Sequence, residues 1–380
     1  MSPSRTTRWI PAVTLCLLVA GAAPPPEPVD IAAAGRTRWY YIAADEVAWN
    51  YVPGDRDEVH GRAFADTAFL IQGAPRPVAT TYRKAVYREY TDSTFRTLKP
   101  QGPQWEHLGF VGPVLRGEVG DTIRVVFRNN GNRPYSMHPH GVFYNKDSEG
   151  APYNDGTAGA DKRDDGVPPQ GTHVYVWPVP ERAGPTAGEG SSVMWMYHSH
   201  VDETKDVNTG LLGVMVVTRR GLARPDGSPN DVDREFVAVF AQTHEEDSWL
   251  APANIPDGFN LRTLRPNPSQ VQNFYPYFVT FTVNGFAHGS MPLAAMTMRR
   301  GERVRWYIMA STNDFDFHAV HWHGNTVTAN HMRTDVVNIG MMQMVTADMA
   351  PDNPGTWLLH CHVTFHNAAG MATRYAVVDR

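Results

Sequence analysis

The sequence lacks several features that mark common classes of protein. Among its 380 residues are only two cysteines, no basic tract and no arginine-rich arm. It also has no apolar run as long as the ~20 residues that span a bilayer and no long stretch of helical periodicity. Because the chain has a formal net charge of -5, we do not expect nucleic acid as a partner. We therefore expect a chain built mainly from strands.

The N-terminal residues have the pattern of an export signal. Arg5 and Arg8 come before an apolar run over residues 9–20, and small residues around it would allow cleavage after Ala22. The alternative is an uncleaved anchor. We expect a signal peptide over residues 1–22, a secreted or periplasmic location, and no membrane contact once the signal is removed.

The scarcity of cysteine bears directly on chemistry. Cys16 would leave with the signal peptide, so Cys361 would be the single cysteine of the mature chain. An exported protein with one cysteine can form no internal disulfide. The thiol of Cys361 is therefore either a liability or a ligand.

Apolar residues at every second position recur between clusters of glycine, proline, asparagine and aspartate. These runs are TIRVVFR from Thr122, HVYVWPV from His173, GVMVVTR from Gly213, EFVAVFA from Glu235, FVTFTVN from Phe278, RVRWYIM from Arg303 and TRYAVVD from Thr373. Alternation of this kind predicts short strands joined by turns. The expected fold class is all-β, a sandwich or barrel.

The two halves of the chain also repeat each other. GDTIRVVFR is followed by SMHPHG in the first half, and GERVRWYIM by AVHWHG in the second, while YHSHV pairs with LHCHV. We expect two tandem sandwich domains, over residues 36–218 and 232–380, joined by a linker at 219–231.

Ten of the 16 histidines fall into four clusters, each with a His-x-His pair. A single pair is usually an ordinary hydrogen-bonded feature, but four pairs duplicated with the fold indicate metal ligands, because residues two apart on a strand share a face. The six remaining histidines are interpreted as ordinary: His60, His107, His173, His244, His288 and His331. The clustered histidines are His138, His140, His198, His200, His318, His321, His323, His360, His362 and His366.

The halves differ in one set of residues. A thiolate, two imidazoles and a weak axial thioether form a blue copper site. The second half has all four donors, at His318, Cys361, His366 and Met371. The first half has Tyr135, Ser199 and Leu211 instead, with no histidine in VDETKD after its HSH motif. The sequence therefore predicts one such copper, in the second half only, and a separate cluster of eight histidines, four from each half.

The motifs HxHG, HxH, HxxHxHG and HCHxxxHxxxxM together resemble those of the multicopper oxidases, specifically the bacterial two-domain small laccases with their blue copper in the second domain. YYIAADEVAWNY and GPVLRGEVGDTI are similar to ceruloplasmin-type domains. The resemblance implies cupredoxin-like Greek-key domains and four coppers per functional unit: one type 1, one type 2 and two type 3.

The resemblance also assigns ligand roles by position. The type 1 ligands would be His318, Cys361, His366 and Met371, and the type 2 ligands His138 and His321. The type 3 ligands would be His140, His198, His200, His323, His360 and His362. Glu149 is expected as proton donor and Tyr144 as a redox-active neighbour of the cluster.

The implied activity is that of a laccase. Phenols or aromatic amines would give single electrons at the solvent-facing edge of His366, and the cluster would reduce dioxygen to water with four. Cys361 is joined through the backbone to His360 and His362, which provides a covalent route between the sites. Two-domain relatives close the cluster between neighbouring subunits, so a homotrimer is expected.

Three other functions are weighed. A metal oxidase for Fe(II) or Cu(I) fits the ceruloplasmin-like context, but Phe365 stands before His366 and Tyr275 to Gly285 has no acid. The methionines of MRTDVVNIGMMQM (Met332, Met341, Met342 and Met344) could serve Cu(I), although core filling is the commoner use. A copper nitrite reductase would carry its blue copper in the first domain. An electron carrier would not need eight further histidines.

Overall fold

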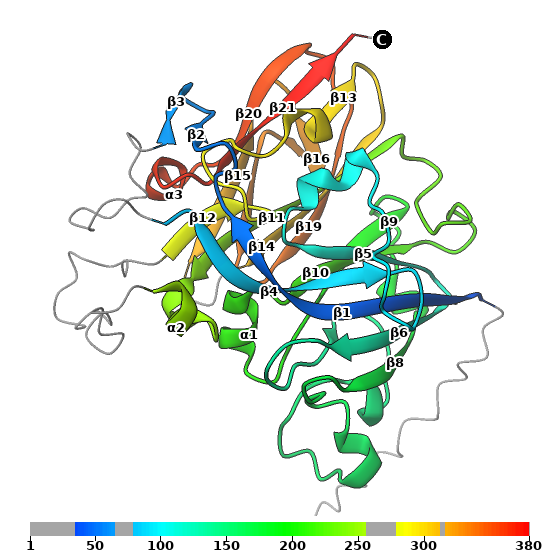
Figure 1. Ribbon diagram of the computed structural model, residues 1–380. Coiled ribbons are helices and arrows are strands. Elements are labelled where there is room, and N and C mark those ends of the chain that lie inside the picture. The colour runs from blue at the N-terminus through cyan, green and yellow to red at the C-terminus, as the bar shows by residue number, and fades with distance from the viewer. Residues whose placement is uncertain (1–34, 65–78, 256–278, 312–315, 380) are drawn as a thin grey trace, which may run out of the picture. The chain divides into compact units, whose positions relative to one another are not determined.

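The computed structural model describes residues 35–64, 79–255, 279–311 and 316–379 (Figure 1). The expected signal peptide and Cys16 lie outside these residues. Residues from Ala33 to the end form one compact unit. Within the described residues, no helix has the length and apolar character needed to cross a membrane.

The first half contains two four-stranded sheets, in the orders β4-β1-β6-β8 and β5-β10-β9-β7. Strands β1, β4, β6 and β8 span Thr37–Asn50, Thr81–Tyr90, Thr122–Asn129 and Thr172–Pro178. Strands β5, β7, β9 and β10 span Gly112–Glu118, His138–Pro139, Ser192–His198 and Leu212–Thr218. A separate hairpin joins β2 (Arg56–Asp57) and β3 (Arg62–Ala63).

The second half contains a six-stranded sheet, β12-β11-β14-β19-β16-β17, and a five-stranded sheet, β13-β21-β20-β15-β18. The six-stranded sheet is made of β11 (Arg234–His244), β12 (Val279–Val283), β14 (Val304–Ser311), β16 (Val327–Ala329), β17 (Met332–Thr334) and β19 (Met344–Met349). The other is made of β13 (Thr297–Arg299), β15 (Phe317–Trp322), β18 (Val336–Gly340), β20 (Gly355–Cys361) and β21 (Ala372–Val378).

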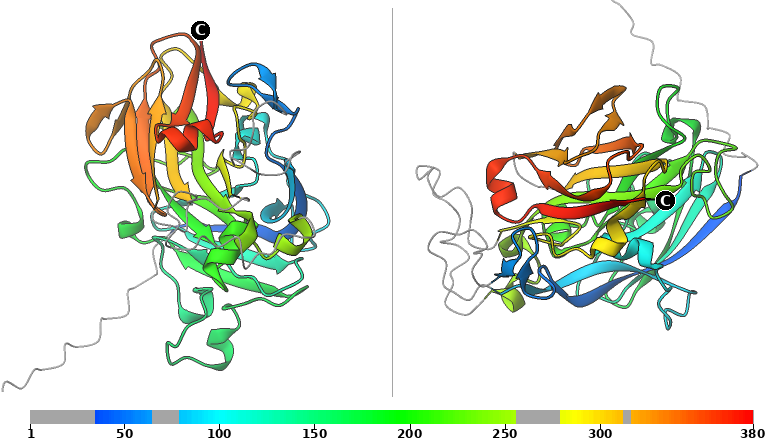
Figure 2. Two further views of the ribbon diagram at one scale, coloured as in Figure 1. Left: turned by 90° about the vertical axis from the view of Figure 1, so that its left-hand side faces the viewer. Right: turned by 90° about the horizontal axis from the view of Figure 1, so that it is seen from above.

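Helices are short and lie in the connections. The α-helices are α1 (Glu203–Thr209), α2 (Ala251–Asn254) and α3 (Thr364–Ala368). The 3-10 turns are η2 (Pro103–Leu108), η3 (Lys146–Ser148), η4 (Gly159–Lys162), η5 (Glu181–Ala183), η6 (Glu245–Asp247) and η7 (Leu293–Met296). Figure 2 shows the short helical coils among the strands.

The strand pairing repeats between the halves. β1 runs parallel to β6, which pairs antiparallel with β8, just as β11 runs parallel to β14, which pairs antiparallel with β19. In the other sheets, β10 runs parallel to β5 and antiparallel to β9, and β21 bears the same relation to β13 and β20. The all-β fold class, with two tandem sandwiches, is confirmed. The domain limits at residues 218 and 232 stay a prediction.

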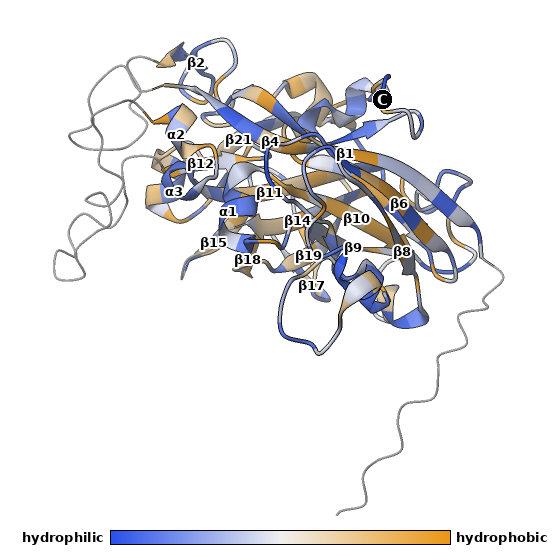
Figure 3. Ribbon diagram, turned by 60° about the horizontal axis from the view of Figure 1, so that its bottom comes forward, coloured by the Kyte–Doolittle hydropathy of each residue, from blue (hydrophilic) through white to orange (hydrophobic). Residues whose placement is uncertain are grey.

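Apolar residues lie mainly along the strands (Figure 3) and form three buried clusters. Each half has its own cluster between its sheets, and Cys361 and Met371 belong to that of the second half. The third cluster draws on both halves, with Met194 and Val214 from the first and Val239 and Tyr307 from the second. Strands β10 and β14 at this contact are buried along their whole length, so both of their faces are covered.

Candidate metal centres

One donor group joins a thiol to two imidazoles. His318 lies on β15, Cys361 ends β20, and His366 lies in α3. The Sγ atom of Cys361 is 3.7 Å from Nδ1 of His318 and 3.5 Å from Nδ1 of His366, and these two nitrogens are 3.2 Å apart. All three residues are fully buried. Three of the four donors predicted for blue copper therefore lie around one point.

The chain reaches this point through a tight turn after α3. The backbone N–H of Met371 donates to the carbonyl of His366 at 2.9 Å, and the N–H of Cys361 donates to the carbonyl of Met371 at 3.0 Å. Gly370 makes the turn with φ of 107°, a conformation that other residues rarely adopt. Met371 is thereby buried in the same apolar cluster as Cys361.

An acid that the sequence interpretation missed lies against this group. Oδ2 of Asp316 is 2.9 Å from Nε2 of His366, the ring nitrogen that faces away from Cys361. Burial lowers the pKa of His366, but contact with Asp316 and Cys361 outweighs it and raises the pKa to about 9. The expectation of a solvent-facing His366 edge is wrong, because the ring is buried, and the Asp316 side chain against it is 15% exposed.

The first half brings its four clustered histidines together. Ligand atoms of His138, His140 and His198 lie within 4.8 Å of one another. The Nε2 atoms of His140 and His198 are 3.2 Å apart. The ring of His200 lies 5.1 Å from that of His138. Nδ1 of His138 contacts the backbone oxygen of Glu149 at 2.6 Å, which leaves Nε2 available as a ligand.

The second half repeats this arrangement. Ligand atoms of His321, His323 and His360 lie within 4.8 Å of one another. Nε2 of His360 is 3.1 Å from both Nδ1 of His321 and Nε2 of His323. The ring of His362 lies 5.1 Å from that of His321. The metal-sized groups found among the described residues combine histidines of one half only.

The protonation of these rings suits a metal. Burial lowers the pKa of His318 to about 4, and burial together with neighbouring histidines lowers those of His140 and His360 to about 4. A neutral imidazole offers a lone pair, and Cu(II) binds imidazole and thiolate donors strongly. Imidazole nitrogens 3.1–3.2 Å apart, without a protonated partner between them, fit a shared cation.

Glu149 and Tyr144 lie beside the first histidine group. The ring of Tyr144 is 5.7 Å from that of His138, and the side chain is 36% exposed. The carboxylate of Glu149 points away, because it contacts Lys146 at 2.5 Å and accepts from the hydroxyl of Tyr153 at 2.9 Å. Glu149 therefore touches His138 through its backbone.

Further acids near the histidines escaped the sequence interpretation. Glu203 lies 3.5 Å from Nε2 of His200, and Asp335 lies 3.6 Å from Nε2 of His321. Glu203 lies three residues after the HSH motif, which is a signal that could have been noticed. A fourth group of possible ligands comprises His244, Glu246 and Asp247. The sequence pattern indicates an ordinary histidine at His244 and does not predict this group.

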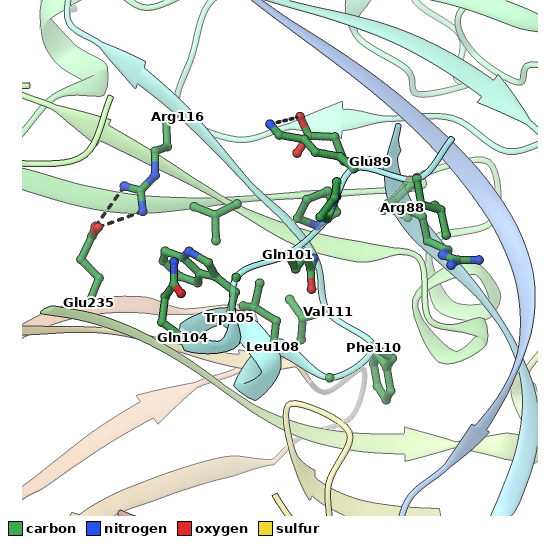
Figure 4. Close-up of a pocket in the computed structure, with 18 of the residues that line it drawn as sticks. Arg88, Glu89, Gln101, Gln104, Trp105, Leu108, Phe110, Val111, Arg116 and Glu235 are labelled. Carbon is green, nitrogen blue, oxygen red and sulfur yellow. Dashed lines mark hydrogen bonds and ion pairs between the residues drawn. The ribbon is translucent and has the colours of Figure 1, made fainter. Parts of the chain in front are cut away.

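A large cavity lies away from these histidine groups. It has a volume of about 1260 Å³ and is lined by Trp105, Gln104, Arg88 and the ion pair between Arg116 and Glu235 (Figure 4). No histidine of the four groups lines it. The position of this cavity therefore gives no reason to assign it a role at the metal centres.

A pair of cupredoxin-like sandwiches with an imidazole-thiolate group and two histidine groups defines a class of copper-binding redox proteins. Comparison with known sequences identifies the family: the multicopper oxidase pattern matches residues 107–221 and 261–380. The chain belongs to the multicopper oxidases, and this membership implies copper cofactors.

Several curated relatives are similar over most of this chain. Human ferroxidase HEPHL1 is 43% identical over 350 residues, which cover 90% of this chain but 29% of that protein. Human hephaestin is 38% identical, with 90% and 29% covered, and mouse ceruloplasmin is 37% identical, with 93% and 33% covered. The chain thus spans about a third of the length of these relatives.

Solved structures agree on the fold. A blue copper oxidase from Nitrosomonas europaea superposes with a TM-score of 0.57 at 16% identity, over 90% of this chain and 86% of that one. A second multicopper oxidase structure gives a TM-score of 0.53 at 17% identity, over 90% and 88%. At these identities the likeness concerns the fold alone.

Proposed function

We propose that this chain is a copper oxidase that couples one-electron oxidation of a metal ion, Fe(II) first, to the four-electron reduction of dioxygen to water. The observation that carries the choice of reductant is the carboxylate of Asp316 against Nε2 of His366. A carboxylate at this nitrogen attracts a cation to the group that would hold the electron-accepting copper. The names of the ferroxidase relatives support the same choice.

The donor groups support the copper roles that the sequence predicts. His318, Cys361, His366 and Met371 would hold the type 1 copper, His138 and His321 the type 2, and the other six clustered histidines the type 3 pair. When bound, these metals accept electrons singly and pass four to dioxygen. The protein fixes the donors, excludes water from Cys361 and joins it through two peptide bonds to His360 and His362.

The reaction balances in electrons and protons. Four Fe(II) ions each lose one electron, and one dioxygen with four protons becomes two molecules of water. Glu149 is proposed as a source of these protons, and Tyr144 as a neighbour able to supply an electron. The ring of Tyr144, 5.7 Å from that of His138, supports its role, whereas Glu149 contacts His138 through its backbone oxygen and not through its carboxylate.

A laccase-like activity is the second candidate. Phe317, next to Asp316, is 56% exposed and could lie against an aromatic ring. The methionines support a Cu(I) site less well, because Met342 and Met344 pack against the apolar cluster between the halves. Copper nitrite reductase and a simple carrier are disfavoured, since the thiolate group is in the second half and eight further histidines are grouped.

Each half supplies four histidines to a separate group, so a cluster of eight requires two such groups to meet. We propose that they meet between neighbouring subunits of a homotrimer. Sedimentation of the copper-loaded protein tests this proposal. A copper-loaded, active monomer would contradict it.

Oxygen uptake by the copper-loaded protein tests the function. Fe(II), Cu(I) and a substituted phenol are supplied separately at matched concentrations, with the spontaneous oxidation of Fe(II) subtracted. We expect the highest kcat/KM with Fe(II). Turnover with the phenol alone would favour the laccase-like candidate, and a protein that reduces no dioxygen with any of them would not be an oxidase.

A further inference from the structure

The fourth donor group lies apart from every proposed copper ligand. His244 is the last residue of β11, and Glu246 and Asp247 lie on the adjoining turn η6. One ligand atom from each residue lies within 4.8 Å of the other two. Nδ1 of His244 is 3.0 Å from Oε1 of Glu246. The group thus offers one imidazole and two carboxylates to a single point.

Strand alternation places His244 on the same face of β11 as the apolar residues near Cys361. Phe236, Ala238 and Phe240 of β11 belong to the apolar cluster that contains Cys361. Residues two apart on a strand share a face, so His244 continues this series. Glu245 lies on the opposite face, where it pairs with buried Lys84 at 2.9 Å.

The carboxylate of Glu246 is largely buried at this point. Lys84 is taken up by Glu245, and among the described residues no Lys or Arg forms an ion pair with Glu246. The side chain of Glu246 is only 10% exposed, and its buried Oε2 accepts no hydrogen bond from the described residues. Burial, followed by the charges of Glu245 and Glu246, raises the pKa of Tyr82. A buried carboxylate oxygen without a partner is costly unless a cation lies beside it.

The group is close to the thiolate site along the sheet. His244 pairs with Val279 on β12, and Phe281 is two residues further along that strand. The ring of Phe281 stacks on His366 with centroids 4.9 Å apart. At a rise of ~3.3 Å per residue, His244 is about 7 Å along the sheet from Phe281. Electrons from this group would therefore have a short path to His366.

We propose that His244, Glu246 and Asp247 form a binding site for the metal ion that the enzyme oxidises. One imidazole and two carboxylates suit Fe(II), and Mn(II) or Co(II) as its mimics, whereas Cu(I) prefers softer sulfur donors. The inference rests on the proposed oxidase function. Four Fe(II) ions in succession would each give one electron to a copper held by His318, Cys361 and His366 and leave as Fe(III), which supplies the four electrons that one dioxygen requires.

Metal binding is measured first, because it does not depend on turnover. The copper-loaded protein is dialysed against Mn(II), and bound manganese is counted by atomic spectroscopy. We expect one ion per chain, weakened about tenfold or more in both Glu246→Gln and Asp247→Asn. The matched control is Glu106→Gln, which removes an exposed glutamate from another 3-10 turn, η2. Unchanged Mn(II) binding in both variants would overturn the site.

Turnover then tests the role of the bound ion. Both variants should raise the KM for Fe(II) about tenfold and keep kcat/KM for a phenol, because the thiolate group is untouched. Equal kinetics with Fe(II) in parent and variants would overturn the substrate role even if Mn(II) binds. If the parent oxidises nothing, the proposed function fails, whereas the dialysis still decides whether the site exists.

Discussion

The HSH motif of the first half and the HCH motif of the second occupy equivalent positions in the two sandwiches but differ in their central residue. Ser199 donates to Oδ2 of Asp206 at 2.6 Å and accepts from the backbone N–H of Ser136 at 3.0 Å. Cys361 instead faces two imidazole nitrogens at 3.5 and 3.7 Å. One centre is a closed hydrogen-bond network, and the other is a set of donors that face one point.

The neighbouring elements have diverged accordingly. In the first half, Asp206 of α1 is buried and also accepts from the indole of Trp249 at 2.8 Å. In the second, the shorter helix α3 presents His366. The flanking His-x-His pairs nevertheless group alike in both halves. The comparison teaches that the histidine groups follow from the fold that the two halves share. The thiolate group, in contrast, needs different residues on three separate elements.

The largest effect is expected from Cys361→Ser, which gives the second half the centre of the first. It should abolish the blue absorption and reduce turnover with every reductant to background, because the sulfur donor and its backbone link are lost. The visible spectrum, oxygen uptake and copper content measure this. Retained copper at the histidine groups is part of the expectation, and retained blue absorption would contradict the assignment.

Asp206→Ala should open the closed network of the first half. Ser199, Trp249 and the backbone N–H of Val201 would lose their shared acceptor, and Ser199 is fully buried. We expect a loss of about 3 kcal/mol in the free energy of unfolding, measured by urea denaturation. Asp206→Asn, which keeps one acceptor, should lose less. If Asp206→Ala left the free energy of unfolding unchanged, the network would not be what holds the first centre together.

Asp316→Asn should separate metal ions from phenols as reductants. It removes the negative charge beside His366 and keeps the shape, so kcat/KM for Fe(II) should fall about tenfold while that for a phenol changes little. Stopped-flow reduction of the blue absorption measures both. Asp352→Asn, an exposed acid in a loop, is the control. Equal losses for both reductants would show that Asp316 positions His366 rather than attracting the cation.

The smallest effect is expected from Ser199→Cys. Tyr135 and Leu211 remain where the second half has His318 and Met371, so a thiol alone should produce no second blue absorption. The weaker hydrogen bond to Asp206 should cost about 1 kcal/mol of stability. Spectra of copper-loaded Ser199→Cys/Cys361→Ser test this against a colourless background. A blue double variant would mean that the sulfur alone specifies the site.

Most of the fold was predictable because strand alternation is a local property. The runs from Thr122, Glu235 and Arg303 became β6, β11 and β14. The grouping of histidines was also predictable, since their spacing repeats with the strands. Asp316 and the His244 group were not, because their importance depends on which segments meet at a sheet edge.

The sequence by itself determined the two sandwiches, the duplicated histidine pairs and the cysteine between two of those histidines. Each of these features depends on the spacing of residues along a single strand. Only the tertiary structure decided that His366 is buried behind Asp316 rather than facing solvent. It alone placed a carboxylate-rich group about 7 Å along the sheet from Phe281. The physical reason is that burial and charge depend on contacts between elements distant in sequence, which no local pattern encodes.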